Sequence, residues 1–323
     1  MSESTVVPSA TADPAARRAL MAGVAAEPGS SKPDPILEVD KIERHFGGMT
    51  AVDVAHLEVQ RGIITALIGP NGAGKTTFFN LITGFDRPSS ARTGAHWSFD
   101  GTKLDKTSAS SVARAGMVRT FQLTKALNRM TVMDNMMLGA QNQAGENLAK
   151  SLFKPLWFRQ EREIELKAKD LLDRFKLLEK KDDYAGSLSG GQRKLLEMAR
   201  ALMSDPKMIM LDEPMAGVNP ALTQSLLGHI QSLRDDGMTV LFVEHDMHVV
   251  RHISDWVVVM AEGRLVAEGS ADTVMANPAV IDAYLGAHHD TDLGDDELLS
   301  DEKMHEIAEE VAAEGADHEG DQP

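Results

Sequence analysis

The sequence predicts an α/β protein in which buried strands alternate with helices around one glycine-rich loop. Three observations support this fold class. The loop Gly69–Thr77 follows the apolar run Ile63–Ile68 and precedes a helix-like segment. A second apolar strand ends in Asp212 and Glu213, and a stretch from about 124 to 185 has helical spacing without strand alternation. This order is typical of doubly wound sheets, whose strand ends face a ligand crevice.

The loop itself reads G-P-N-G-A-G-K-T-T and fits the pattern G-x-x-x-x-G-K-[ST]. A glycine-rich turn between strand and helix exposes successive backbone N–H groups to an anion. Lys75 adds a positive charge for the β- and γ-phosphates, and Thr76 supplies a hydroxyl for Mg²⁺. A chance glycine turn is disfavoured because strand, loop, Lys75 and Thr76 are all in register. We therefore expect ATP or a similar nucleotide to contact Asn71, Gly72, Ala73, Gly74, Lys75, Thr76 and Thr77.

Composition limits what else the chain can be. Its 323 residues, 42% of them hydrophobic, suffice for one large domain or two modest ones. No stretch approaches the roughly 18 consecutive apolar residues of a membrane span, so membrane association is expected to go through a partner or the surface. The absence of cysteine excludes disulfides and thiolate chemistry and is compatible with the cytosol.

Charge is unevenly placed along the chain. Of the net charge of −16, residues 290–323 carry −13, from 14 acidic side chains and one lysine. We expect no nucleic-acid partner, because the remainder is near neutral and such binding needs a basic surface. We also expect disordered tails over 1–34 and 289–323 and a folded domain over 35–288. Arg17 and Arg18 precede a short Ala-rich run, but this run is too short and too far inside the tail to favour a signal peptide.

The elements of the first half follow from periodicity and turn residues. Expected strands are Ile36–Val39, Ala51–Val59, Ile63–Ile68, Trp97–Phe99 and Val118–Gln122, and expected helices begin at Thr76, Ser110, Thr131 and Arg159. Ile164, Leu171 and Phe175 recur at helical spacing in the last of these. We therefore expect a helical subdomain over about 123–187, inserted between two halves of an α/β core.

The second half continues the alternation. A helix runs from Ser189 to about Ser204, and Asn219-Pro220 starts another with a cap residue and a first-turn proline. The expected strands are Met208–Leu211, Thr239–Val243 and a closing hairpin of Trp256–Met260 with Arg264–Ala267, followed by short helices to about Gly286.

Two constellations carry chemistry besides the loop. Asp212 at a strand end is expected to hold Mg²⁺, and Glu213 to accept a proton from, or orient, the water that attacks the γ-phosphate. Ser189 and Gln192 form a capping box at the start of a helix. Gly190 and Gly191 directly after the cap disfavour a helix, but they suit an anion close to the helix N-terminus. A second nucleotide, held by another subunit, is the natural candidate.

The run L-S-G-G-Q, about 20 residues before the D-E strand, resembles the signature of ATP-binding cassette (ABC) ATPases. The resemblance covers roughly residues 36–287. It implies a P-loop NTPase with a RecA-like core, an antiparallel β-subdomain and the inserted helical subdomain. It also implies a head-to-tail dimer in which two ATP molecules lie between the loop of one subunit and Ser189, Gly190, Gly191 and Gln192 of the other.

The resemblance assigns further roles. It implies that Phe46 stacks on adenine, that Gln122 senses Mg²⁺ and the attacking water near the membrane subunits, and that His245 contacts the γ-phosphate. Residues 216–219 would cross the dimer seam, where the family commonly has Asp in place of Asn219. A metal site built from His245 and two histidines of the next helix is a weaker alternative.

Within that family, several motifs look like the ATPase of branched-chain amino-acid importers: F-G-G-M-T-A-V-D, V-R-T-F-Q, M-T-V-M-D-N, E-P-M-A-G-V-N-P and N-P-A-V-I-D-A-Y-L-G. This implies permease subunits, a substrate-binding protein and a second ATPase, identical or related, with the chain peripheral on the cytoplasmic face of the membrane. The alternatives are an ABC ATPase for another cargo such as urea or a lipid, a catalytically silent regulator, and a soluble ABC protein of repair or translation. Intact Lys75, Asp212, Glu213 and His245 disfavour the silent regulator, and a single cassette disfavours the last alternative.

Overall fold

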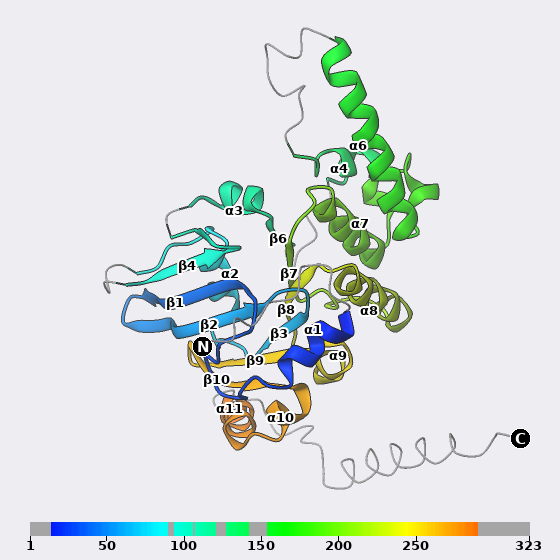
Figure 1. Cartoon of the computed structure of the whole chain (residues 1–323). Coiled ribbons are helices and arrows are strands. Elements are labelled where there is room, and N and C mark those ends of the chain that lie inside the picture. Colours follow the sequence, from blue (N-terminus) through cyan, green and yellow to red (C-terminus); the bar gives the residue numbers. More distant parts are fainter. Residues whose placement is uncertain (1–13, 90–93, 106, 121–126, 142–153, 290–323) are drawn as a thin grey trace, which may run out of the picture. The chain divides into compact units, whose positions relative to one another are not determined.

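The computed structural model describes residues 14–89, 94–105, 107–120, 127–141 and 154–289. Two sheets organise these residues (Figure 1). The antiparallel sheet has the order β2-β1-β4-β5 and is formed by Met49–Gln60, Pro35–Phe46, His96–Phe99 and Thr102–Lys103. Contacts divide the chain into residues 1–284 and residues 285–323, and the two sheets, the site and the cavity described below lie in the first of these units.

The second sheet has the order β10-β9-β3-β8-β7-β6, with all neighbours parallel except the β9–β10 hairpin. Its strands are Arg264–Gly269, Trp256–Ala261, Ile64–Ile68, Thr239–Val243, Met208–Asp212 and Met117–Arg119. Strands β3, β7 and β8 are buried along their whole length. This explains their continuous apolar runs, because a parallel sheet is covered on both faces.

Successive residues of these strands enter two different hydrophobic cores. Ala66 and Phe242 pack in one cluster with the helices of the second half, whereas Leu67 and Leu241 pack in the other with the antiparallel sheet. The alternation follows from the period of two along a strand. The parallel sheet is therefore the layer that both cores share.

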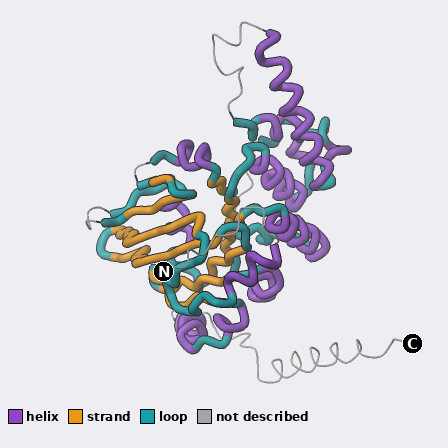
Figure 2. The backbone as a smooth tube through the Cα atoms, in the orientation of Figure 1, coloured by secondary structure: helices purple, strands orange, loops and turns teal. Residues whose placement is uncertain are grey.

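The helices agree closely with the expected ones. They are α2 (Lys75–Ile82), α3 (Ala109–Ala115), α4 (Val132–Met137), α6 (Lys154–Arg174), α7 (Gly190–Leu202), α8 (Pro220–Asp235), α9 (Met247–Ile253), α10 (Ala271–Met275) and α11 (Pro278–His289), with short 3₁₀ turns at Leu178–Lys180 and Ala185–Ser187. Figure 2 shows α4 and α6, with the loops around them, set to one side of the strands. Thr131 caps α4 with a capping box, so this helix starts where the sequence places it.

The segment before the first strand differs from the expectation of a disordered tail over 1–34. Residues 14–21 form helix α1 (Pro14–Met21), and the chain after it packs on the core. Lys32 and Glu268 make a fully buried ion pair with an N–O distance of 3.1 Å. The Glu268 carboxylate also accepts hydrogen bonds from the Ser30 amide and the Trp256 indole. Composition missed this because the docking rests on a few specific contacts, those of Met21, Val24 and Lys32.

The buried pair gives a prediction for stability. Glu268→Gln removes the counter-charge of the Lys32 ammonium and leaves that charge buried. Breaking a buried pair from one side costs about 3–5 kcal/mol, so we expect the free energy of unfolding, measured by urea titration, to fall by an amount of this order. The double variant Lys32→Met with Glu268→Gln should recover most of the loss, because no charge is left buried and the amide oxygen at position 268 can still accept a hydrogen bond from Ser30 or Trp256. A Glu268→Gln protein within about 1 kcal/mol of the parent would show that the segment does not dock.

Candidate functional site

The chemistry-bearing residues come from the carboxyl ends of three adjacent parallel strands. In the sheet β8 lies between β3 and β7. The glycine-rich loop follows β3, Glu244 and His245 follow β8, and Asp212 and Glu213 end β7. Because parallel strands end at one edge of a sheet, these residues are gathered there although they span more than 170 positions.

The loop depends on glycine where the backbone is crowded. Gly74 has φ 97°, and a Cβ there would lie 2.3 Å from the carbonyl oxygen of Ala51 in β2. Gly69 has φ 148°, and its Cβ would lie 2.0 Å from the Met260 carbonyl oxygen. Gly72 has open space around it and needs glycine only for its φ of 81°.

Lys75 is held inside the loop. Its Nζ donates hydrogen bonds to the carbonyl oxygens of Gly69 and Pro70 at 2.6 and 2.9 Å. Burial lowers the pKa of Lys75, and the negative charges of Glu213 and Asp212 oppose that change. The ammonium is therefore held by the loop within the electrostatic field of the two carboxylates at the end of β7.

Asp212 is fixed by a residue that the sequence reasoning left without a role. The guanidinium of Arg119, at the end of β6, donates from Nη2 to Asp212 Oδ2 at 2.6 Å and from Nη1 to Asn80 Oδ1 at 2.7 Å. Both members of the Arg119–Asp212 pair are buried. Arg119 thus ties the last turn of α2 to the end of β7. No signal in the sequence indicated this role, because Arg119 is the second residue of the predicted strand Val118–Gln122 whereas it ends β6 in the structure.

Glu213 has a backbone conformation that is uncommon for a residue with a side chain. Its φ is 47°, and its N–H donates to the Val243 carbonyl in β8. From α7, the Lys194 ammonium donates to the carbonyl oxygens of Glu213 and Pro214 at 3.1 and 3.0 Å. Burial lowers the pKa of Lys194, and the charges of Glu244, Glu197 and Glu213 oppose this. The signature helix therefore contacts the backbone that presents Glu213.

At the end of β8, Glu244 is buried whereas His245 is exposed. Glu244 accepts hydrogen bonds from the backbone N–H groups of Met215 and His245. Burial raises the pKa of Glu244, and these hydrogen bonds and His245 oppose the shift. His245 has 63% of its side chain exposed and its Nδ1 lies 3.4 Å from Glu244 Oε2. The imidazole therefore lies next to the carboxylate of the preceding residue, Glu244, and is accessible to a ligand.

Phe46 ends β1 and is exposed, with the Arg44 guanidinium 4.5 Å from its ring centroid. It pairs with Met49 across the β1–β2 turn, and β2 then reaches Ala51, which touches the loop at Gly74. The ring thus lies on a hairpin that borders the loop, as an adenine platform requires.

From α11, the buried phenol of Tyr284 faces the Gly69 backbone, and burial raises its pKa to about 12.

The signature stretch opens α7. Ser189 and Gln192 form the predicted capping box, each side chain bonding the backbone of the other at 3.0–3.2 Å. The two glycines differ. A Cβ on Gly191 would lie 1.8 Å from Leu222 Cδ2, so this glycine is explained by packing against α8, whereas Gly190 has open space around it. The expectation of an anion near the helix start now depends on Gly190 alone.

Asn219 caps α8 by accepting a hydrogen bond from the Leu222 amide at 2.9 Å.

Two further expectations concern Gln122 and a histidine metal site. Gln122 lies outside the residues that the structure describes. Among the residues that the structure describes, no group of three or more His, Asp or Glu side chains is arranged to hold a metal ion, and the weaker histidine-metal alternative gains no support.

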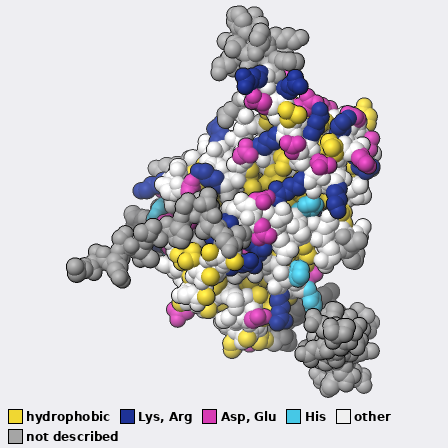
Figure 3. Space-filling model, turned by 45° about the vertical axis from the view of Figure 1, so that its right-hand side comes forward, with side chains coloured by type: hydrophobic (Ala, Val, Ile, Leu, Met, Phe, Trp, Pro, Cys, Tyr) yellow, Lys and Arg dark blue, Asp and Glu magenta, His cyan; other side chains and the backbone are white. Residues whose placement is uncertain are grey.

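No helix of the described chain is long and apolar enough to cross a membrane. Figure 3 shows acidic and basic side chains interspersed on the face in view.

Loop, carboxylates and capped signature helix together define a phosphate-loop nucleotide-binding ATPase. The comparisons with known proteins make the class specific. The family model described as "ABC transporter" matches residues 52–216, and the model "Branched-chain amino acid ATP-binding cassette transporter" matches residues 264–290. The chain belongs to the ABC transporter family, and the predicted fold class and ATPase class are confirmed.

Its relatives include named transport proteins. The chain is 41% identical over 254 residues to the high-affinity branched-chain amino acid transport ATP-binding protein BraF of Pseudomonas aeruginosa, covering 78% of this chain and 98% of that one. It is 39% identical over 252 residues to the probable branched-chain amino acid transport ATP-binding protein LivG of Archaeoglobus fulgidus, covering 78% and 96%.

Solved structures agree. A nucleotide-free ATP-binding cassette from an ABC transporter superposes with a TM-score of 0.67 at 37% identity, covering 77% of this chain and 98% of that chain. The ADP conformation of another ABC transporter cassette gives a TM-score of 0.66 at 36% identity, covering 78% and 99%. Nucleotide binding is therefore a property of the fold that this chain shares.

The Lys194 contacts give a kinetic prediction. Lys194→Met removes two charge-assisted hydrogen bonds to the backbone around Glu213, each worth about 1.5–3 kcal/mol. We expect kcat for ATP hydrolysis to fall about tenfold or more while the ATP dissociation constant changes less than about threefold, because the loop is untouched. Lys169→Met on α6, which removes an ion pair with Glu165 away from the strand ends, is the matched control and should keep parental kcat. An unchanged kcat would remove Lys194 from the site.

Glu244 gives a prediction for pH. The pKa of this carboxyl is higher in the folded than in the unfolded state. Between these two pKa values the folded protein binds more protons than the unfolded chain, so the free energy of unfolding falls as the pH rises through this range. We therefore expect the free energy of unfolding of the parent, relative to Glu244→Gln, to decrease from about pH 4 towards neutral pH. Urea titrations of both proteins at each pH provide the measurement, and a flat difference would contradict the prediction.

Proposed function

We propose that this chain is the ATP-hydrolysing subunit of an importer of branched-chain amino acids and energises separate permease subunits. The observation that carries the ATPase part is the position of Lys75, Asp212 and Glu213 beyond β3 and β7, two parallel strands that end at the same edge of the sheet. The observation that carries the cargo is the match of residues 264–290 to the branched-chain family, together with the names of the relatives.

Each residue at the edge has one task in the proposed hydrolysis. The loop amides and the Lys75 ammonium bind the β- and γ-phosphates. Glu213 accepts a proton from the attacking water, and the backbone contact from Lys194 keeps its carboxylate in position. His245 contacts the γ-phosphate from the next strand, and Phe46 stacks on the adenine. Gln122 would sense the attacking water.

The donor set also suits Mg²⁺. The Thr76 hydroxyl lies at the exposed start of α2 and the Asp212 carboxylate at the neighbouring strand end, and a hard cation prefers such oxygen ligands. Thr76, Asp212 and Gln122 would hold the ion, which when bound neutralises charge on the phosphates. Arg119 keeps Asp212 in one orientation for that role.

A second copy of the cassette, or a related one, is part of the proposal. The Ser189 cap leaves the first helical amides of α7 beside the open space at Gly190, so an anion of another subunit can approach there. A head-to-tail dimer would place Ser189, Gly190, Gly191 and Gln192 on the ATP held by the partner's loop. The chain would then lie peripherally on the cytoplasmic face of the membrane, against permeases served by a substrate-binding protein. Urea, another amino acid or a lipid is the alternative cargo.

Glu213→Gln tests the catalytic assignment. The amide cannot accept the proton, so we expect ATP binding to persist while kcat falls at least about a hundredfold. Because ATP is no longer consumed, size-exclusion chromatography with ATP should show a long-lived dimer. Glu262→Gln, on the β9–β10 turn, is the control and should keep parental turnover. Near-parental hydrolysis by Glu213→Gln would refute its role as base.

Cargo is tested in cells. Deleting the gene should reduce uptake of labelled leucine, isoleucine or valine at low concentration, where other transporters contribute little, and the parent gene should restore it. A gene carrying Glu213→Gln should fail to restore uptake. If uptake of all three is unchanged while urea or another solute is lost, the ATPase mechanism stands and the cargo is wrong.

A further inference from the structure

A large cavity lies at the edge of the parallel sheet opposite to the phosphate loop. Its volume is about 700 Å³, which is within the range of small-molecule sites. Lys207 and Met238 line it directly before β7 and β8 begin, and Asp34 directly before β1. The loop follows the carboxyl end of β3, so this cavity belongs to a different part of the fold from the ATP site.

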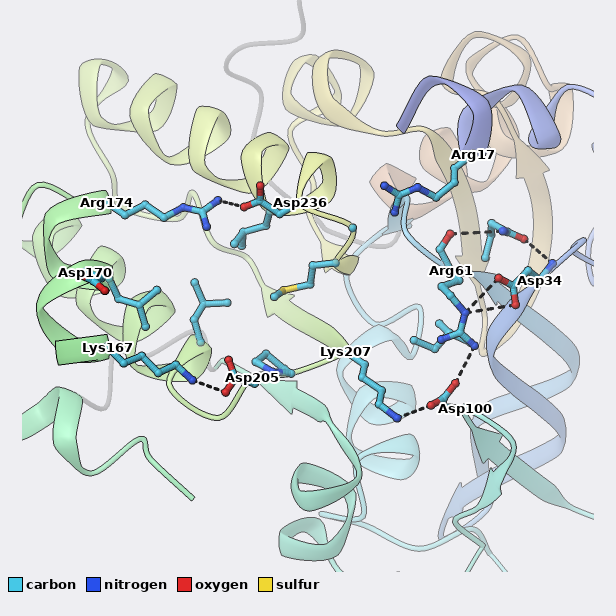
Figure 4. A pocket seen from close by; sticks show the side chains of 18 of the residues that line it. Arg17, Asp34, Arg61, Asp100, Lys167, Asp170, Arg174, Asp205, Lys207 and Asp236 are labelled. Carbon is cyan, nitrogen blue, oxygen red and sulfur yellow. Dashed lines mark hydrogen bonds and ion pairs between the residues drawn. The ribbon is translucent and has the colours of Figure 1, made fainter. Parts of the chain in front are cut away.

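Charged side chains ring the cavity, and nearly all of them are paired. Arg61 bonds Asp34 and Asp100 at 3.2 and 2.8 Å, and Figure 4 shows these groups on one wall. On the opposite wall, Arg174 pairs with Asp236 at 2.6 Å. Lys167 pairs with Asp205, and Lys207 pairs with Asp100. The remaining carboxylate, Asp170, is exposed to water on α6.

Arg17 of α1 is the exception. It is 9% exposed, and its buried Nε has no hydrogen-bond partner in the described chain. No ion pair of Arg17 is found among the described residues either. Its guanidinium is seated over two glycines, since a Cβ on Gly62 would lie 2.2 Å from Nη1 and one on Gly237 would lie 3.4 Å from it. Figure 4 shows the side chain directed from α1 into the cavity.

Only Nε is sealed from water; the Nη atoms have no partner among the described residues and are open to the cavity that Arg17 lines. An anion in the cavity would supply that partner, and the planar fork of arginine suits a carboxylate. The other four cations of the lining are already paired with aspartates, so Arg17 alone offers a charge to a ligand, and a single carboxylate matches it better than a dianion. Leu20, Leu171, Leu202, Leu233 and Met238 also line it, so the rest of the ligand should be apolar.

We propose that this cavity binds a monocarboxylate with an apolar chain, with the carboxylate on Arg17 and the chain between α6 and the amino ends of the sheet. Because residues of α1, α6, α7 and the core all line the cavity, such a ligand would link the helical part of the cassette to the part that holds the loop. It is therefore a second ligand site, separate from the nucleotide site.

Octanoate is the probe that tests the proposal by isothermal titration calorimetry on the full chain. Three control ligands separate the contributions. Octan-1-ol keeps the apolar chain but lacks the charge, and acetate keeps the carboxylate but lacks the chain. Inorganic phosphate tests whether the cavity prefers a different anion. We expect saturable binding of one octanoate per chain, with each of the other three at least about tenfold weaker, since a charge-assisted hydrogen bond is worth about 1.5–3 kcal/mol. Equal binding of octan-1-ol, or tighter binding of phosphate, overturns the proposal.

Variants locate the site. Arg17→Gln should weaken octanoate binding about tenfold or more, whereas Arg18→Gln, the neighbouring exposed arginine that faces Asp255 at 3.9 Å, should change it less than about twofold. Leu171→Trp should fill the cavity and abolish binding from the opposite wall. Urea titration of each variant confirms that it is folded. If Arg17→Gln and Leu171→Trp both bind as the parent does, the site is not this cavity.

Hydrogen exchange gives an independent readout. Octanoate should protect backbone amides of residues 14–21 and 167–174, which border the cavity, and leave those of residues 69–77 unchanged. Protection confined to residues 69–77 would place the ligand in the nucleotide site, and absence of any protection at saturating octanoate would also overturn the proposal.

Discussion

The parallel pairing of β8 with both β3 and β7 is the constraint on which the rest of the site depends. It places the residues after β3, β8 and β7 next to one another at one edge. Each strand is buried on both faces, so its register is held by two cores at once. A one-residue slip in any of the three would exchange the two faces and misplace the residue at its end.

Around that edge, polar contacts from distant elements fix the backbone. Arg119 joins β6, α2 and β7 through Asn80 and Asp212, and Lys194 joins α7 to the carbonyls of Glu213 and Pro214. Glu213 keeps a positive φ between these contacts. Uncommon backbone conformations of this kind persist where the surroundings determine them several times over. The ATPase chemistry proposed for Glu213 depends on that support.

The two ends of the parallel sheet differ in character. At the carboxyl ends, lysine, carboxylates and histidine converge on one loop. At the amino ends, ion pairs such as Arg61–Asp34 and Arg174–Asp236 line a cavity in which Arg17 is the cation without a partner among the described residues. The helix that carries Arg17 packs on the core through Met21, and the segment after it is held by the buried Lys32–Glu268 pair. A segment that composition alone marks as a tail thus contributes to the fold and to a second site.

The sequence by itself determined the loop, the D-E strand end, the capping box at Ser189 and the cap at Asn219, because each depends on residues close together in the chain. It also determined the strands and helices of the core, since periodicity and burial are local properties. Only the tertiary structure decided the roles of Arg119, Lys194 and Glu244, because their partners lie in other elements. It likewise assigned Gly191 to packing against Leu222 and seated Arg17 over Gly62. Such contacts are set by how strands and helices are ordered in space, which no local pattern of residues encodes.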